Sequence, residues 1–161
     1  MKKKNPEQTV DGYKVIVNNK KARFNYHFIE TYEAGIVLTG AEIKSIRAGH
    51  ITLNEAYVRV DQGELYLIGS HINEYSHNSS PNYNPTRSRK LLMHRTEIKK
   101  LNGQINEKGY TIVPTHLYLK KGRAKLGVAL AKGKDAPDKR QTVKDREGKL
   151  KARRAIKNYS S

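Results

Sequence analysis

The hydropathy pattern changes abruptly at Lys132, and this change limits what the chain can fold into. Before it, every second residue from Ala124 to Leu130 is apolar, as in a strand with one buried face. After it, residues 132–161 contain eleven Lys or Arg against four Asp or Glu, with few large apolar side chains. Such a segment buries too little apolar surface to offset its own ordering entropy. The sequence therefore predicts a folded body that ends near Ala131 and a basic C-terminal tail that is disordered in the free protein.

The positive charge is not confined to this tail. The formal net charge of the 161-residue chain is +17, of which the tail accounts for +7 and the preceding residues for the other +10. Because the charge covers both parts, we expect both to contact one large polyanion. Nucleic acid is the first candidate and an anionic membrane surface the second. In a third interpretation, the charge serves only solubility.

Several functional classes are disfavoured by what the sequence lacks. It contains no cysteine, which excludes disulfides, thiol nucleophiles and thiolate metal sites. The basic first residues are followed by no apolar run, so we expect no signal peptide, and no apolar stretch approaches membrane-spanning length. These features favour a cytoplasmic protein without a membrane partner.

Short alternating segments separated by turn residues predict an antiparallel all-β body over residues 13–131, preceded by a flexible N-terminus at 1–12. One segment, 24–38, places Phe24 on the same face as Tyr26 and Phe28, and Gly35 within it suggests a bulge or bend. The predicted strands are 13–17, 24–38, 56–60, 64–69, 110–119 and 123–131, with hairpin turns at 61–63 and 120–122.

Two short helices are predicted beside these strands. In residues 41–47, Ile43 and Ile46 face inward, whereas Glu42, Lys44 and Arg47 face outward. In residues 96–102, Ile98 and Leu101 face inward and Gly103 ends the helix. Strands that close on themselves leave no exposed edge, so an OB-type antiparallel β-barrel is the expected fold. Such barrels often bind nucleic acid.

No residue pattern typical of catalysis is present. The six histidines include no i, i+4 pair and lie beside no carboxylate cluster, and no nucleophile elbow occurs. Gly133-Lys134 lacks the upstream glycine of a phosphate loop. We therefore predict no enzymatic activity, metal, cofactor or small-molecule ligand.

Residues 82–94 are the segment best suited to contact RNA. Arg87, Arg89 and Lys90 can meet phosphates, and the rings of Tyr83 and His94 can stack on unpaired bases. Alternatively, the segment is a basic loop that leads into a core strand.

Several segments, in this order along nearly the whole chain, resemble the SsrA-binding protein (SmpB) family. They are residues 19–23, 31–49, 85–92, 109–114, 126–134 and 138–140. The resemblance implies an OB-type barrel that binds the tRNA-like domain of transfer-messenger RNA. It also implies trans-translation, in which stalled ribosomes are rescued and the unfinished product is tagged. The implied partners are that RNA, the ribosome and, through the RNA complex, elongation factor Tu.

The family's RNA-contacting positions match Glu33, Leu92 and His94. As an acceptor, Glu33 can take a hydrogen bond from a base amino group or a ribose hydroxyl. With the basic residues of the matching segments, the candidate RNA-binding set is Lys20, Lys21, Arg23, Glu33, Arg87, Arg89, Lys90, Leu92 and His94.

The resemblance further implies that the basic tail enters the empty decoding centre and messenger channel and becomes helical there. The candidate ribosome-engaging residues are Lys132, Gly133, Lys134, Pro137, Asp138, Lys139, Arg140, Lys144 and Arg146. Family tails commonly carry a lysine where this chain has Asp135 and a ring where it has Pro137. Because proline is well tolerated at the first helical position, we predict that the bound helix starts at Pro137.

Three alternatives stay open at this point. A ribosomal protein or general RNA chaperone would also be basic and tailed. An RNA-modifying or RNA-cleaving enzyme would need a clustered acid–base pair, which is not recognisable in the sequence. A membrane-surface protein would need large apolar residues opposite the basic face of the tail, which has few.

Overall fold

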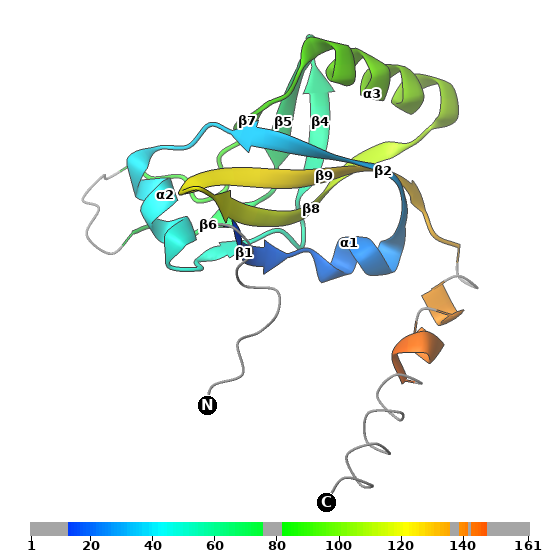
Figure 1. Ribbon diagram of the computed structural model, residues 1–161, viewed down its shortest axis with the longest axis horizontal. Helices are drawn as coiled ribbons and strands as arrows, with labels where there is room; N and C mark the ends of the chain where they lie inside the picture. The colour runs from blue at the N-terminus through cyan, green and yellow to red at the C-terminus, as the bar shows by residue number, and fades with distance from the viewer. Residues whose placement is uncertain (1–12, 76–81, 136–138, 142, 148–161) are drawn as a thin grey trace, which may run out of the picture.

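Most strands of the protein join one antiparallel sheet that curves back on itself (Figure 1). The computed structural model describes residues 13–75, 82–135, 139–141 and 143–147. Seven strands are bonded in the order β1-β8-β4-β5-β7-β2-β9, and β3 pairs separately with β6. The elements are β1 (Tyr13–Asn18), α1 (Lys20–Asn25), β2 (Tyr26–Ile36), α2 (Gly40–Arg47), β3 (Ile51–Thr52), β4 (Tyr57–Asp61), β5 (Glu64–Ile68), β6 (His71–Ile72), β7 (Arg89–Leu92), α3 (Arg95–Lys108), β8 (Thr111–Lys120) and β9 (Arg123–Gly133).

The sheet closes because β8 pairs with β9 along one edge and with β4 along the other. The link to β4 is the single pair Val58–Ile112, and β1 occupies the rest of that edge, opposite residues 116–120 of β8. Closure through one residue pair makes the sheet OB-like rather than a clean barrel. This architecture confirms the predicted fold class.

Both predicted hairpins form, and their turns explain why. The β4–β5 turn has positive φ at Gln62 (50°) and Gly63 (77°), and the β8–β9 turn has it at Lys121 (50°) and Gly122 (78°). Two consecutive residues of positive φ give the twist that matches flanking antiparallel strands, and glycine adopts that conformation without strain. β9 then continues to Gly133, two residues beyond the predicted end of the strand at Ala131.

The inward faces of the strands and two helices form the main core. Ile46 of α2, and Ile98 and Leu101 of α3, pack there as predicted. Each fully buried side chain of this size stabilises the fold by about 1.5–3 kcal/mol. The core residues below 2% exposure include Leu65, Leu67, Leu91, Leu117, Leu126, Val128 and Leu130.

Three local predictions are wrong. α3 continues through Gly103 and ends only at Gly109, which adopts the left-handed conformation (φ 66°). Glycine costs a helix interior about 1 kcal/mol, an amount that the buried face of a 14-residue helix can offset. Phe24 belongs to α1 rather than to a strand. The bulge of β2 lies between Phe28 and Glu30 rather than at Gly35.

Helix α1 was not predicted from the sequence, and Asn19 accounts for its formation. The Asn19 side-chain oxygen accepts a hydrogen bond from the Ala22 backbone N–H at 3.1 Å, which caps the helix. Its amide nitrogen donates to the Pro114 carbonyl of β8 at 2.9 Å. One buried asparagine therefore starts α1 and attaches it to the sheet.

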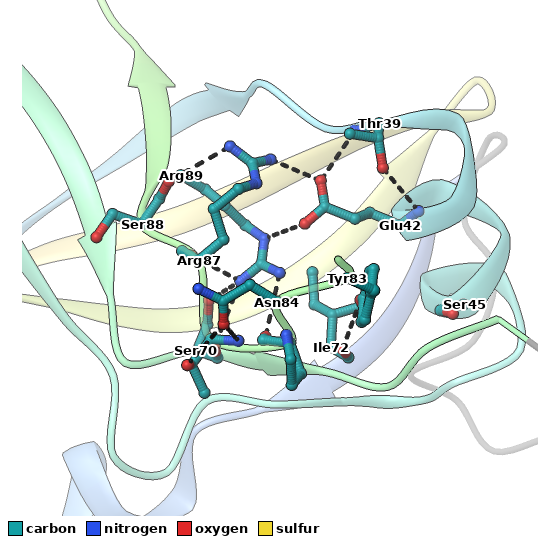
Figure 2. A network of polar contacts seen from close by, with 12 residues as sticks. Thr39, Glu42, Ser45, Ser70, Ile72, Tyr83, Asn84, Arg87, Ser88 and Arg89 are labelled. Carbon is teal, nitrogen blue, oxygen red and sulfur yellow. Dashed lines mark hydrogen bonds and ion pairs between the residues drawn. The ribbon is translucent and has the colours of Figure 1, made fainter. Parts of the chain in front are cut away.

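Glu42 and Arg89 form a buried ion pair, which corrects two predictions (Figure 2). Glu42, expected to face outward, is 1% exposed, and Arg89, expected to meet phosphate, is 0% exposed. Arg89 Nε donates to Glu42 Oε2 at 2.6 Å, and Arg87 donates to Glu42 Oε1 at 2.6 Å. The Thr39 backbone N–H donates to Oε1 at 2.9 Å, completing a capping box for α2.

The remaining donors of Arg89 bind the chain around it. Nη1 donates to the Ser70 hydroxyl at 3.0 Å and the Arg87 carbonyl at 2.9 Å, and Nη2 donates to the Pro85 carbonyl at 3.2 Å. Burial acts to raise the pKa of Glu42, but the hydrogen bonds from Thr39, Arg87 and Arg89 more than offset it and lower that pKa. The network therefore joins α2, β7 and residues 85–88 with the carboxylate ionised.

We predict that Arg89→Met lowers the free energy of unfolding by about 3–5 kcal/mol, because it leaves Glu42 buried without its main partner. The matched control is Arg87→Met, which removes a bond to the same carboxylate from a side chain that is 41% exposed. This control should cost about 1 kcal/mol or less. Urea unfolding followed by circular dichroism measures both, and equal losses would contradict the prediction.

Candidate nucleic-acid interface

An open cleft of about 350 Å³ lies where β2 and β7 meet the start of α3. It brings together Glu33, Leu92 and His94, the three residues that match RNA-contacting positions. We call it the Leu92 cleft, and its lining is Glu33, Gly35, Leu92, Met93, His94, Glu97 and Lys125. The convergence follows from register, because β2 pairs antiparallel with both β7 and β9.

Leu92 is the exposed apolar side of this cleft. It is 53% exposed and lies opposite Gly35 in the β2–β7 register. A Cβ at position 35 would be 3.3 Å from the Leu92 Cβ, so a side chain there would crowd the leucine. A lone exposed leucine is ordinary on a protein surface. Beside a carboxylate and an imidazole, it completes a surface that can pack on an unpaired nucleotide while a polar group reads its edge.

A second cleft, of about 410 Å³, adjoins the first at Glu33, which lines both. We call it the tyrosine cleft, and its lining is Tyr13, Arg23, Phe28, Thr31, Tyr32, Glu33, Thr115, His116, Tyr118 and Gly127. The Tyr118 ring stacks with Tyr13 at a centroid distance of 4.5 Å and with His116 at 4.9 Å. Tyr118 itself is 4% exposed, so these rings form a rigid wall of the cleft.

Glu33 is an ionised acceptor on this basic protein. The Tyr118 hydroxyl donates to its Oε2, and Lys120 Nζ lies 3.7 Å from the same oxygen. The hydrogen bond from Tyr118 lowers the pKa of Glu33 most, burial opposes it, and the charges of Lys120 and Lys125 lower it further. Near neutral pH the carboxylate can therefore accept hydrogen bonds but repels phosphate.

The basic segment before the Leu92 cleft is only partly placed as predicted. Arg89 is enclosed in the buried network, so it cannot reach a phosphate in this structure. Arg87 pairs with Glu42, and Lys90 pairs with Glu64 at 2.6 Å. The Tyr83 hydroxyl donates to the Ile72 carbonyl at 2.6 Å, which places the tyrosine beside β6. The segment leads into strand β7 as a basic loop, and RNA contact by Tyr83, Arg87 and Lys90 stays a prediction.

The three basic candidates on α1 are placed differently from one another. Arg23 lines the tyrosine cleft, and Lys21 forms an ion pair with Glu55. Lys20 is exposed. Neither Lys20 nor Arg23 forms an ion pair within the part of the chain that the structure describes.

The tail candidates begin within the sheet. Lys132 and Gly133 end β9, and the Lys134 N–H donates to the Asn25 carbonyl of α1 at 2.8 Å. Residues 139–141 and 143–147, which include Lys139, Arg140, Lys144 and Arg146, are helical. The Arg146 guanidinium lies 5.7 Å from the centroid of the Phe24 ring. Pro137 and Asp138, including the predicted helix start, lie outside the described residues.

Several residues of the two clefts were missed in the sequence. Lys125 occupies an outward position in the alternating pattern of β9, between Ala124 and Leu126, and could have been found from that pattern. Tyr118 and His116 follow each other on β8 at the same spacing, but nothing in the sequence places them beside Tyr13 or Glu33. That proximity depends on pairings of β8 with β1 and β9.

Residues 13–75, 82–135, 139–141 and 143–147 contain neither a metal-binding cluster nor a membrane-spanning helix. Within them, no three His, Asp or Glu side chains gather closely enough to hold a metal ion. Among the helices of this part of the chain, none has the length and apolar character needed to cross a membrane.

Residues 16–158 match the SmpB protein family. The chain belongs to this family. An SsrA-binding protein of Shouchella clausii (strain KSM-K16) is 50% identical over 150 residues, which cover 93% of this chain and 96% of that protein. The SsrA-binding protein of Halalkalibacterium halodurans is 51% identical over 144 residues, with 89% and 94% covered.

A solved structure extends this likeness to three dimensions. It is described as "tmRNA-SmpB: a journey to the center of the bacterial ribosome". Its matching chain is 42% identical, with a TM-score of 0.63, and the match covers 79% of this chain and 93% of that one. Family membership thus rests on sequence and on fold.

We predict that Lys20→Ala with Arg23→Ala reduces the slope of log affinity for RNA against log salt by up to about two units, if each cation meets one phosphate. The matched pair, Arg87→Ala with Lys90→Ala, should reduce it less, because both cations are already paired with carboxylates. Filter binding over a salt series measures both slopes. A larger effect of the second pair would contradict this assignment.

Proposed function

We propose that this chain is a non-enzymatic, cytoplasmic RNA-binding adaptor. In this proposal it binds the tRNA-like domain of transfer-messenger RNA and delivers it to stalled ribosomes for trans-translation. The observation that carries the proposal is the convergence of Glu33, Leu92 and His94 in one cleft of a chain that belongs to the SmpB family. Elongation factor Tu takes part only through the RNA complex.

The chemistry of the two clefts favours unpaired nucleotides over duplex RNA. Each cleft has the size of a few side chains, whereas a duplex presents phosphates and ribose hydroxyls over a broad surface. Leu92 offers an apolar face, and His94 offers a ring for stacking. Glu33 favours bases and riboses over phosphates, because its carboxylate accepts hydrogen bonds from base amino groups and ribose hydroxyls and repels phosphates.

Positive charge at the borders of the two clefts and beside them supplies attraction without sequence preference. Lys20 and Arg23 on α1 and Lys125 on β9 can neutralise phosphates on either side of the unpaired nucleotides. Arg87 and Lys90 can join them only by leaving their carboxylate partners. Arg89 serves the fold, which in turn positions Leu92 on the same short strand.

In the same proposal, the tail enters the empty decoding centre and messenger channel as a helix. Its Lys and Arg side chains repel one another in the free protein, and ribosomal phosphates remove that repulsion. The helical residues 139–141 and 143–147 support this view, because the tail forms helical turns once it leaves β9. Lys132, Gly133 and Lys134 fix its point of departure from the sheet.

We predict that Leu92→Ala weakens binding to the isolated tRNA-like domain by about tenfold, as truncation of an interface anchor does. The matched control is Val37→Ala, since Val37 is 45% exposed and lies outside both clefts. Binding to an elongator tRNA at the same salt should be weaker and unaffected by either change. Calorimetry measures the affinities, and equal binding of both RNAs would instead favour a general RNA chaperone.

We also predict that body and tail separate functionally. A chain that ends at Asp135 keeps all of β9 and the bond between Lys134 and Asn25, so it should stay folded. It should bind the tRNA-like domain within a few-fold of the full chain and fail to support tagging on stalled ribosomes. A reconstituted translation assay reports the tagging, and unimpaired tagging would overturn the role given to the tail.

A further inference from the structure

We propose that Tyr118 is a positioning residue for RNA recognition: its hydroxyl holds the Glu33 carboxylate in the orientation in which that group meets RNA. The inference rests on the proposed function for its consequence in binding. The arrangement itself can be tested in the free protein.

Tyr118 has little freedom of its own. Its side chain is buried, and its ring stacks with those of Tyr13 and His116. A buried tyrosine hydroxyl requires a hydrogen-bond partner, and Tyr118 donates to Glu33 Oε2. The most immobile ring of the tyrosine cleft therefore ends at the one acidic residue that both clefts share.

Glu33 does not have this rigidity without Tyr118. Its side chain is 43% exposed on a strand, and a glutamate in that setting samples several rotamers. Lys120 Nζ stands 3.7 Å from Oε2, and Lys125 lies in the Leu92 cleft on the other side. Either lysine could draw a mobile carboxylate into an ion pair. Because the Tyr118 hydroxyl and Lys120 both contact Oε2, Oε1 is the oxygen left to accept from a ligand.

The same bond also lowers the pKa of Glu33, and it does so more than any other contact of this carboxyl. Loss of the hydroxyl should raise that pKa toward its ordinary value, so the carboxylate would become protonated at higher pH. Other titratable or charged groups surround it from β1, α1, β7–α3, β8 and β9, and all of them except Lys120 line one of the two clefts. They are Tyr13, Arg23, His94, Glu97, His116, Lys120 and Lys125.

Tyr13 offers a matched control. Its ring makes the same kind of stacking contact with Tyr118, but its hydroxyl lies 2.8 Å from His116 Nε2 rather than beside Glu33. Burial lowers the pKa of His116, with a further effect of Arg23, so the imidazole stays neutral near pH 7. Tyr13→Phe and Tyr118→Phe each remove one hydroxyl and keep the ring stack. Only Tyr118→Phe removes a contact to Glu33.

The first experiment uses the free protein. The Glu33 side-chain carboxyl carbon is followed by NMR from about pH 3 to pH 6, which spans the ordinary range for a glutamate. We expect a higher midpoint in Tyr118→Phe than in the parent, and an unchanged midpoint in Tyr13→Phe. An unchanged midpoint in Tyr118→Phe overturns the proposal, because the hydroxyl would then not hold the carboxylate.

The second experiment measures binding of the isolated tRNA-like domain near neutral pH. We expect Tyr118→Phe to weaken binding by about three- to tenfold, which corresponds to one hydrogen bond. Tyr13→Phe also alters the lining of the tyrosine cleft but keeps the contact between Tyr118 and Glu33, so it should weaken binding less than Tyr118→Phe does. In a Glu33→Ala background, Tyr118→Phe should have no further effect, because no acceptor is left for the Tyr118 hydroxyl to orient. Equal losses from Tyr118→Phe in both backgrounds overturn the positioning role and assign Tyr118 to the fold.

These outcomes distinguish the positioning role from the proposed function. If the parent binds the tRNA-like domain no better than an elongator tRNA, the proposed function fails, while the NMR midpoints still decide whether Tyr118 holds Glu33. If the parent binds selectively and Glu33→Ala weakens that binding, but Tyr118→Phe does not, only the positioning role fails.

Discussion

The structure depends on burying one carboxylate between two arginines. Moving a charged group out of water costs several kcal/mol, so Glu42 is tolerable inside the protein only with its hydrogen-bonding sites filled. Thr39, Arg87 and Arg89 donate hydrogen bonds to these sites. The other N–H groups of Arg89 donate to Ser70, Arg87 and Pro85. A cluster of apolar residues could stabilise the same space as well. Unlike apolar contacts, the hydrogen bonds of a planar guanidinium are directional. They therefore fix the placement of α2, residues 85–88 and β7 relative to one another. Leu92 is the last residue of β7, so the network that holds β7 also positions the Leu92 cleft.

The basic side chains of the folded body lie in three different environments. Arg89 is internal and holds the fold, whereas Arg87 and Lys90 sit at the surface but are neutralised by Glu42 and Glu64. Lys125 borders the Leu92 cleft, where its charge also keeps Glu33 ionised. A net charge of +17 favours a polyanionic partner, yet it does not show which cations would reach such a partner. Ion pairing within the body makes that selection.

Much of the fold was predictable because it follows from local rules. Alternation and turn chemistry predicted both hairpins, and helical spacing predicted that Ile98 and Leu101 face the core. The same local rules wrongly predicted that Glu42 faces outward, because its partner Arg89 is remote in the sequence. The capping box at Thr39 and Glu42 indicates the start of α2, but not that the glutamate is buried. The family resemblance predicted Glu33, Leu92 and His94 as site residues. Periodicity alone could not, because it does not distinguish a functional exposed leucine from an ordinary one. The position of Tyr118 beside Glu33 could not be predicted from the sequence, because it depends on which strands flank β8.

One ladder of hydrogen bonds separates the two functional regions. β2 and β9 pair from Tyr26–Gly133 at one end to Gly35–Lys125 at the other. Glu33 and Lys125 therefore lie near one end of the ladder, and the tail leaves the sheet at the opposite end. At about 3.3 Å per residue, the eight steps from Lys125 to Gly133 span roughly 25 Å. The bulge between Phe28 and Glu30 bends β2 within the ladder, but the continuous pairing with β9 still fixes the separation between the cleft and the start of the tail. In the proposed function, RNA held at Glu33 and a tail entering a channel would be separated by a distance that the fold, rather than a flexible linker, determines.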